Sequence, residues 1–161
     1  MILSLLGLMN SARAADPIPN PKIDAAGFLR MTQEAMNARS SRRLTEDEFV
    51  RFADEPGTVI LDARSRDRYQ LLHVRGAISL PFTDMTIESM HRLLPDPRVR
   101  ILIYCNNNFE RDEVAFASKA PPAALNLSTF VSLYTYGYRN VYELGPLLDV
   151  HRTRIPLVRG R

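Results

Sequence analysis

The sequence contains a single cysteine, Cys105, among its 161 residues, and it contains no tryptophan. One cysteine excludes an intramolecular disulfide, so the fold cannot depend on covalent cross-links. Zinc sites need several ligands at characteristic spacings, and no such spacing of His, Cys, Asp or Glu occurs along the chain. We therefore expect no metal site and no cofactor. The Cys105 thiol is then either a buried, inert side chain or a free group kept for chemistry.

No apolar run reaches the length of about 20 residues that a membrane-spanning helix needs. The N-terminal run Met1–Met9 is shorter than that, and a small-x-small pattern, Ala12-Arg-Ala14, follows it. These features are typical of the apolar region and cleavage site of a secretory signal peptide. We expect residues 1–14 to be a signal peptide cleaved after Ala14, and the mature protein to be periplasmic or secreted, without a transmembrane segment. The alternative is a disordered or partly packed N-terminal tail in a cytosolic protein.

Neither sign of charge dominates, since the chain has 21 basic and 18 acidic residues and a formal net charge of +3. The densest basic cluster, Arg39, Arg42 and Arg43, has no aromatic residues interleaved with it. Nucleic-acid-binding proteins carry a clustered basic stripe, so we expect solvated surface charge here and no nucleic-acid partner. A composition of 45% hydrophobic and 24% charged residues is that of an ordinary globular protein. Internal repeats are absent, and the length suits one domain.

Strand and helix patterns alternate along the chain. Short apolar runs typical of buried parallel strands occur at Thr58–Asp62, Ala77–Pro81, Val99–Tyr104 and Asn140–Leu144. Helices are predicted at 24–38, 65–72, 86–94 and 127–136, and another begins after Thr45, which forms a capping box with Glu48. This order produces right-handed β-α-β units. It predicts a parallel sheet that is covered by helices on both faces.

Cys105 comes directly after the strongest strand pattern. Functional groups of parallel sheets lie just beyond the carboxyl ends of the strands, so Cys105 is expected at the rim of the sheet. A catalytic thiol must be held as a thiolate, which backbone N–H groups or a helix N-terminus can stabilise. Asn106, Asn107 and Asn108 suit such a loop, because asparagine tolerates the left-handed backbone that turns successive amides inward. The alternative is a small, buried, inert side chain at a strand end.

Three separated motifs resemble the rhodanese family, and they occur in the family's order. The first comprises Asp62-Ala-Arg64, then Asp67 and Tyr69, then the segment from His73 to Phe82, which contains Gly76-Ala77 and Leu80-Pro81. The second is Ile101-Leu-Ile-Tyr-Cys105, similar to the strand that leads into the family's catalytic cysteine, and the third is Gly137–Leu144. The resemblance predicts a rhodanese-like domain at 44–148, with a three-layer α/β/α fold and a central, mostly parallel sheet of about five strands. A linker and N-terminal helix at 15–43 and a C-terminal tail at 149–161 complete the chain.

The resemblance implies a sulfurtransferase. Cys105 would take sulfane sulfur from a donor such as thiosulfate or polysulfide, hold it as a persulfide, and pass it to a thiol or another nucleophilic acceptor. The predicted substrate-binding loop, which would cradle the anion, comprises Asn106, Asn107, Asn108, Phe109, Glu110 and Arg111. Asp62 and Arg64 resemble a polar pair that supports the site. A protein partner is a further possibility that the family allows.

The loop after Cys105 departs from the family pattern, because it has no glycine and about twenty residues separate it from the helix predicted at Leu127. This distance predicts that the thiolate loses the helix N-terminus, unless 109–119 forms an extra helix capped by Asn108. Two alternatives to the sulfurtransferase follow. Cys105 and Arg111 match the Cys-x5-Arg pattern of cysteine phosphatases, in which the arginine binds phosphate bidentately. A rhodanese-like binding module without catalysis is the other.

Overall fold

The computed structural model describes residues 18–160, so the predicted signal peptide at 1–14 lies outside the described residues. Within these residues, five parallel strands form one sheet in the order β1-β7-β5-β2-β4. The strands are β1 (Arg43–Leu44), β2 (Thr58–Asp62), β4 (Ile78–Ser79), β5 (Arg100–Tyr104) and β7 (Val141–Leu144). The central pair is β2 and β5, whose register runs from Thr58 opposite Arg100 to Asp62 opposite Tyr104.

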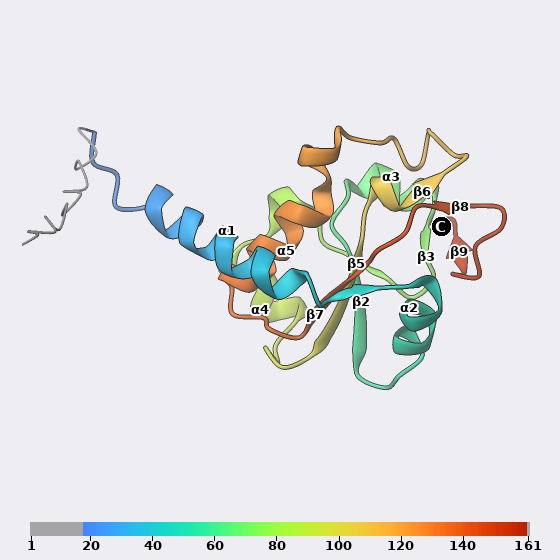
Figure 1. Cartoon of the computed structure of the whole chain (residues 1–161), viewed down its shortest axis with the longest axis horizontal. Coiled ribbons are helices and arrows are strands. Elements are labelled where there is room, and N and C mark those ends of the chain that lie inside the picture. Colours follow the sequence, from blue (N-terminus) through green and yellow to red (C-terminus); the bar gives the residue numbers. More distant parts are fainter. Residues whose placement is uncertain (1–17, 161) are drawn as a thin grey trace, which may run out of the picture.

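Helices cover both faces of this sheet (Figure 1). The helices α1 (Ala25–Arg39), α4 (Ile87–Leu93) and α5 (Leu125–Thr135) contribute Ala35, Met90 and Phe130 to one hydrophobic cluster. The helices α2 (Glu46–Ala53) and α3 (Arg66–Leu71) pack against the opposite cluster through Phe49 and Tyr69. The structure therefore confirms the predicted three-layer α/β/α architecture with a central parallel sheet.

The side chains of β5 alternate between the two faces of the sheet. Ile101 and Ile103 belong to the cluster under α1, α4 and α5, whereas Leu102 and Tyr104 belong to the cluster under α2 and α3. Because successive side chains of a strand point to opposite faces, Cys105 continues the first series and points toward α5. The alternation within β5 thus decides which helix adjoins the thiol.

Side-chain caps begin several of the helices where the sequence predicts them. Thr45 and Glu48 form the predicted capping box at the start of α2. The Ser65 side chain caps α3, and a reciprocal pair of hydrogen bonds between Thr86 and Ser89 caps α4. Each cap satisfies amides that have no partner within the helix. Short 3-10 turns at Phe82–Asp84, Asn106–Asn108 and Pro121–Ala123 connect the longer elements.

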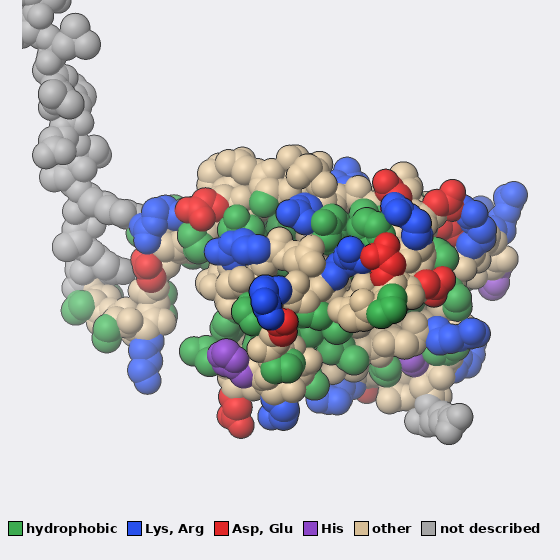
Figure 2. All heavy atoms as spheres, turned by 90° about the horizontal axis from the view of Figure 1, so that it is seen from below, with side chains coloured by type: hydrophobic (Ala, Val, Ile, Leu, Met, Phe, Trp, Pro, Cys, Tyr) green, Lys and Arg blue, Asp and Glu red, His purple; other side chains and the backbone are tan. Residues whose placement is uncertain are grey.

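The N-terminal helix α1 is only half covered. Ala35 is fully buried against α5, but Phe28 and Leu29 expose 62% and 67% of their surface. Figure 1 shows α1 projecting from the body of the molecule, and hydrophobic side chains gather on the projecting segment at the left of Figure 2. The C-terminal half of α1 therefore belongs to the domain, while its N-terminal half extends beyond it.

Part of the segment predicted as a C-terminal tail, 149–161, packs on the domain through two short strands. Residues Leu148–Asp149 form β8, which pairs with β6 (Phe109–Glu110), and Leu157–Val158 form β9, which pairs with β3 (His73–Val74). Ile155, between β8 and β9, is buried in the cluster under α2 and α3. Strands of two residues carry no periodicity, so the sequence offers no local signal for this packing.

Candidate active site

Cys105 lies at the carboxyl end of β5 and exposes only 2% of its surface. Backbone N–H groups adjoin its sulfur, among them those of Asn107 in the neighbouring 3-10 turn and of Leu125 and Asn126, and these three lower the pKa of the thiol. Leu125 and Asn126 are the first two residues of α5. The N-terminus of an 11-residue helix therefore faces the thiol. Its amides and its dipole favour negative charge on the sulfur.

The predicted loss of the helix N-terminus is therefore wrong. The segment after Cys105 returns to the sheet rim through the 3-10 turn at Pro121–Ala123, and α5 begins directly after it. Ala124 occupies the N-cap position of α5 but provides no side-chain hydrogen bond. That residue therefore does not cap the first N–H groups of α5. Two of these N–H groups, those of Leu125 and Asn126, instead act on the cysteine sulfur.

Asn108 holds the backbone of this turn. Its Oδ1 accepts hydrogen bonds from the Cys105 N–H at 2.9 Å and from Asn126 Nδ2 at 3.0 Å. Its Nδ2 donates to the carbonyl oxygens of Leu144 at 2.8 Å and Pro146 at 3.2 Å. One buried side chain thus joins the cysteine, the start of α5 and the end of β7. Such a fully used amide restricts the position of the thiol.

The pKa of the Cys105 thiol reflects opposing influences. Burial is the largest of them and raises the pKa, whereas the amides of Asn126, Asn107 and Leu125 lower it. The nearby Glu143 carboxylate raises it. The net result is a pKa above the ordinary thiol value, so the resting thiol is protonated at neutral pH.

Asp62 and Arg64, the predicted supporting pair, form a buried ion pair. Arg64 Nε and Nη2 donate to Asp62 Oδ1 at 3.0 Å and Oδ2 at 2.6 Å, and further donors reach the carbonyls of Leu72 and Ala115. The Tyr104 hydroxyl donates to Asp62 Oδ2 at 2.5 Å. Burial and the Asp62 charge raise the pKa of Tyr104 well above its usual value, so the hydroxyl keeps its proton. This network fixes the strand ends beside the cysteine and leaves no free group for proton transfer.

A cleft of about 710 Å³ adjoins Cys105. Asn106, the next residue in the chain, and Leu125, whose amide bonds the sulfur, both line it. Apart from Arg64, which is paired with Asp62, its cationic side chains are Arg66, Arg68 and Lys119, and its lining includes a single carboxylate, Asp84. It also contains the hydroxyl groups of Ser65, Thr83 and Ser118. An excess of positive charge around a concave surface attracts anions.

A family model supports the same interpretation over most of the chain. The model of the rhodanese-like domain matches residues 45–144. This chain belongs to the rhodanese-like domain family. The matched region contains Cys105, the first turn of α5 and the Asp62–Arg64 pair.

Solved structures share the rhodanese-like fold at low sequence identity. A thiosulfate sulfurtransferase from Pseudomonas aeruginosa matches with a TM-score of 0.53 and 22% identity, over 83% of this chain and 24% of that one. The Alr3790 protein from Anabaena sp. matches with a TM-score of 0.51 and 19% identity, over 73% of this chain and 92% of that one. EanB, solved with hercynine, matches with a TM-score of 0.53 and 20% identity, over 73% of this chain and 27% of that one. No curated protein matches this sequence.

The second half of the predicted loop of this rhodanese-like domain does not surround the sulfur. Phe109 is buried against Tyr104 and Phe116, and Glu110 is an exposed residue of β6. Arg111 is exposed, has a φ of 73°, and does not line the cleft. A phosphatase loop would bring that arginine back over the cysteine, so the geometry does not favour the Cys-x5-Arg alternative.

Two expectations about residues 106–119 are wrong. The asparagines adopt a 3-10 turn without left-handed backbone, and Arg111 is the only residue of 18–160 other than glycine that has a positive φ. The alternative of an extra helix at 109–119 is also wrong, because β6 and the turns that follow it occupy this segment. This segment is held by Arg64 at the Ala115 carbonyl and by two hydrogen bonds between Asn107 and the Lys119 backbone. It therefore forms a fixed wall of the cleft.

Sequence reasoning missed several residues of the site. Leu125 and Asn126 contribute through their backbone, which leaves no signature in side-chain types. Glu143 lies on β7, and its charge within an otherwise apolar strand was the one signal that could have marked it. Among residues 18–160, no group of three or more His, Cys, Asp or Glu side chains is placed to bind a metal, and no helix is long and apolar enough to cross a membrane.

Proposed function

We propose that this protein is a sulfurtransferase that carries sulfane sulfur as a persulfide on Cys105. The observation that supports it is the position of Cys105, whose sulfur adjoins the backbone amides of Asn107, Leu125 and Asn126 and whose chain neighbour Asn106 lines a basic cleft. The N–H donors favour an anionic sulfur, and the cationic side chains of the cleft favour a small anionic donor such as thiosulfate.

The reaction needs only this thiol and two substrates. The Cys105 thiolate attacks the outer sulfur of thiosulfate, a sulfur–sulfur bond forms on the enzyme, and sulfite leaves with the electron pair of the broken bond. An acceptor thiolate then attacks the outer sulfur of the persulfide, which becomes the acceptor's persulfide, and the Cys105 thiolate is released. The amides of Asn107, Leu125 and Asn126 lie where they stabilise the negative sulfur in both steps.

Mass spectrometry of the intact protein tests this proposal. After incubation with thiosulfate or polysulfide, we expect the wild-type chain to gain the mass of one sulfur atom and to lose it again when a thiol acceptor is added. The Cys105→Ser variant should show neither change. Absence of the adduct with every sulfane donor would contradict the proposal. If the wild-type protein hydrolyses an aryl phosphate and the Arg111→Ala variant does not, the result would instead support the phosphatase.

A binding module without catalysis is the second candidate. The near-complete burial of Cys105 and the raised pKa of its thiol favour this function. In that case a folded wild-type protein would form no persulfide, and its thiol would react slowly with sulfane donors and alkylating agents alike.

We also propose that the protein is exported, because residues 1–14 combine an apolar run with a small-x-small cleavage pattern. The mature N-terminus tests this. Expression with its own N-terminus, followed by mass spectrometry, should show a chain that begins at Ala15. A chain that retains Met1–Ala14 would contradict cleavage.

A further inference from the structure

Glu143 is a buried carboxylate on the same face of the sheet as Cys105. It lies on β7 directly opposite Ile103 of β5, two residues before the cysteine. Side-chain alternation directs Ile103, Cys105 and Glu143 to the face covered by α1 and α5. Glu143 exposes only 1% of its surface. A carboxylate buried this deeply is costly unless cations and hydrogen bonds compensate it.

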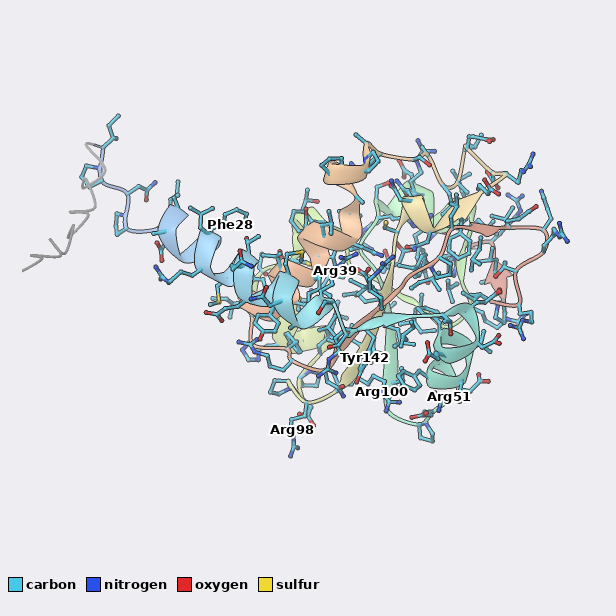
Figure 3. All side chains as sticks on the ribbon, in the orientation of Figure 1. Phe28, Arg39, Arg51, Arg98, Arg100 and Tyr142 are labelled. Atoms are coloured by element: carbon cyan, nitrogen blue, oxygen red, sulfur yellow. The ribbon has the colours of Figure 1, made fainter. Side chains whose placement is uncertain are left out.

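Two arginines provide that compensation, and both come from residues before the matched domain. Arg39, in the last turn of α1, donates from Nε to Glu143 Oε2 at 2.8 Å and from Nη2 to Oε1. Arg43, on β1, donates from Nε to Oε1 at 3.1 Å. The Arg39 side chain is 23% exposed and that of Arg43 is 51% exposed, so Arg39 is the better shielded partner. Figure 3 shows Arg39 at the end of α1 that meets the sheet, and Phe28 at the projecting end.

The remaining charged groups of the site line the cleft or belong to the buried Asp62–Arg64 pair. The residues of α5 from Leu125 to Thr135 carry no charged side chain, so α5 contributes only its backbone amides. The cleft contributes the cations Arg64, Arg66, Arg68 and Lys119 and the carboxylate Asp84. Glu143 is therefore the buried anion whose charge acts on the sulfur from the sheet side, and Arg39 and Arg43 are its counter-ions.

We propose that Arg39 is a positioning residue for Cys105, which holds the Glu143 carboxylate in an ion pair and so shields the cysteine sulfur from that negative charge. This role rests on the proposed function, because it concerns the thiolate that begins sulfur transfer. Helix α1 lies outside the matched rhodanese-like region at 45–144, yet through Arg39 it contributes to the electrostatics of the active site.

The alternative is that Arg39 only anchors α1 to the domain. Stability alone does not separate the two roles, because losing a buried ion-pair partner destabilises the fold in either case. The pH at which the thiol becomes reactive does separate them. A merely structural arginine leaves that pH unchanged in the folded protein, whereas a shielding arginine changes it in a direction that depends on Glu143.

The test measures the rate of Cys105 alkylation by iodoacetamide against pH in four folded proteins: wild type, Arg39→Met, Glu143→Gln and the double variant. We expect Arg39→Met to move the midpoint to higher pH and to slow alkylation at neutral pH by roughly threefold, which corresponds to about half a pKa unit. Glu143→Gln should move the midpoint to lower pH. In the Glu143→Gln background, Arg39→Met should move the midpoint less than it does in wild type, because only the direct charge of Arg39 is lost and no carboxylate remains for it to hold.

Controls keep the outcome decisive. Arg30→Met makes the same substitution on the exposed part of α1, where Arg30 faces Asp24 at 3.8 Å, and should leave the midpoint unchanged. Arg39→Lys keeps the charge and should restore most of the wild-type midpoint. Equal midpoints in folded wild type and Arg39→Met would overturn the proposal. If Arg39→Met does not fold, the absence of a downward shift in Glu143→Gln would overturn it.

Alkylation requires no sulfur donor, so this test is independent of persulfide formation. A wild-type protein that forms no persulfide but shows the expected midpoints would contradict the proposed function and leave the role of Arg39 intact. A wild-type protein that forms the persulfide, with unchanged midpoints in the variants, would contradict the role of Arg39 alone.

Discussion

The side chain of Asn108 binds the backbone N–H of Cys105, with 2.9 Å between Oδ1 and the nitrogen. The same side chain donates to the carbonyl of Leu144 at the end of β7. The position of the thiol is thus tied to the neighbouring strand by one amide. This contact spans 36 residues between Asn108 and Leu144, so it depends on the folded sheet rather than on the local turn.

Replacing Asn108 with alanine removes these contacts. We expect Asn108→Ala to lower the free energy of unfolding by about 1–3 kcal/mol, because the Cys105 N–H and the Leu144 carbonyl are left buried without that partner. Urea denaturation measures the change. Asn37→Ala, at an exposed position of α1, is the matched control and should change stability by about 0.5 kcal/mol or less. Equal effects of the two substitutions would contradict the role of Asn108.

The raised pKa of Cys105 predicts a pH dependence of both reactivity and stability. Alkylation of the folded protein should reach half its maximum rate at a higher pH than alkylation of the urea-unfolded chain. Below the ordinary thiol pKa both states hold the proton. As pH rises from there, the unfolded state loses its proton first, so the folded state loses stability until the folded pKa is passed.

Cys105→Ala provides the reference for the stability measurement. As pH rises through the alkaline range, the unfolding free energy of wild type should fall relative to that of this variant. A difference that stays constant with pH, or a folded alkylation midpoint at or below the unfolded one, would show that the helix and turn amides outweigh burial.

Arg64 should be needed for stability, because it compensates the buried Asp62. We expect Arg64→Met to cost about 3–5 kcal/mol, since the Asp62 charge loses its buried partner. Thermal and urea unfolding provide the measurement. Arg98→Met removes an exposed pair with Asp96 and should leave the free energy of unfolding nearly unchanged. Adding Asp62→Asn to Arg64→Met should recover part of the loss, and a further loss of stability would argue against charge compensation.

The basic side chains of the cleft should bind the sulfur donor. Lys119→Ala and Arg66→Ala should each raise the KM for thiosulfate about fivefold with little change in kcat, because exposed unit charges about 4 Å apart interact by about 1 kcal/mol in water. Steady-state sulfur transfer to a thiol acceptor measures this, and added salt should reduce the difference. Arg92→Ala, on α4 and outside the cleft, should leave KM unchanged. If neither Lys119→Ala nor Arg66→Ala alters the KM for thiosulfate, the donor binds elsewhere.

Local patterns in the sequence predicted most of the fold. The continuous apolar strands β2 and β5 and the capping box at Thr45 are signals that neighbouring residues provide by themselves. Their order was sufficient to predict the parallel sheet and to place Cys105 at its carboxyl edge. The three motifs predicted membership of the rhodanese-like family, which the match over 45–144 confirms.

The tertiary structure alone decided what surrounds the thiol. The chain returns to Cys105 at the first turn of α5, after a long irregular segment. No pattern of neighbouring residues predicts that the two ends of such a segment meet. The ion pair between Arg39 and Glu143 joins residues 104 positions apart, and the last strands, β8 and β9, pair with the distant segments β6 and β3. The sequence by itself therefore determined that a cysteine lies at the rim of a rhodanese-like sheet. The amides and charges that act on its sulfur depend on contacts between distant segments, which form only in the folded chain.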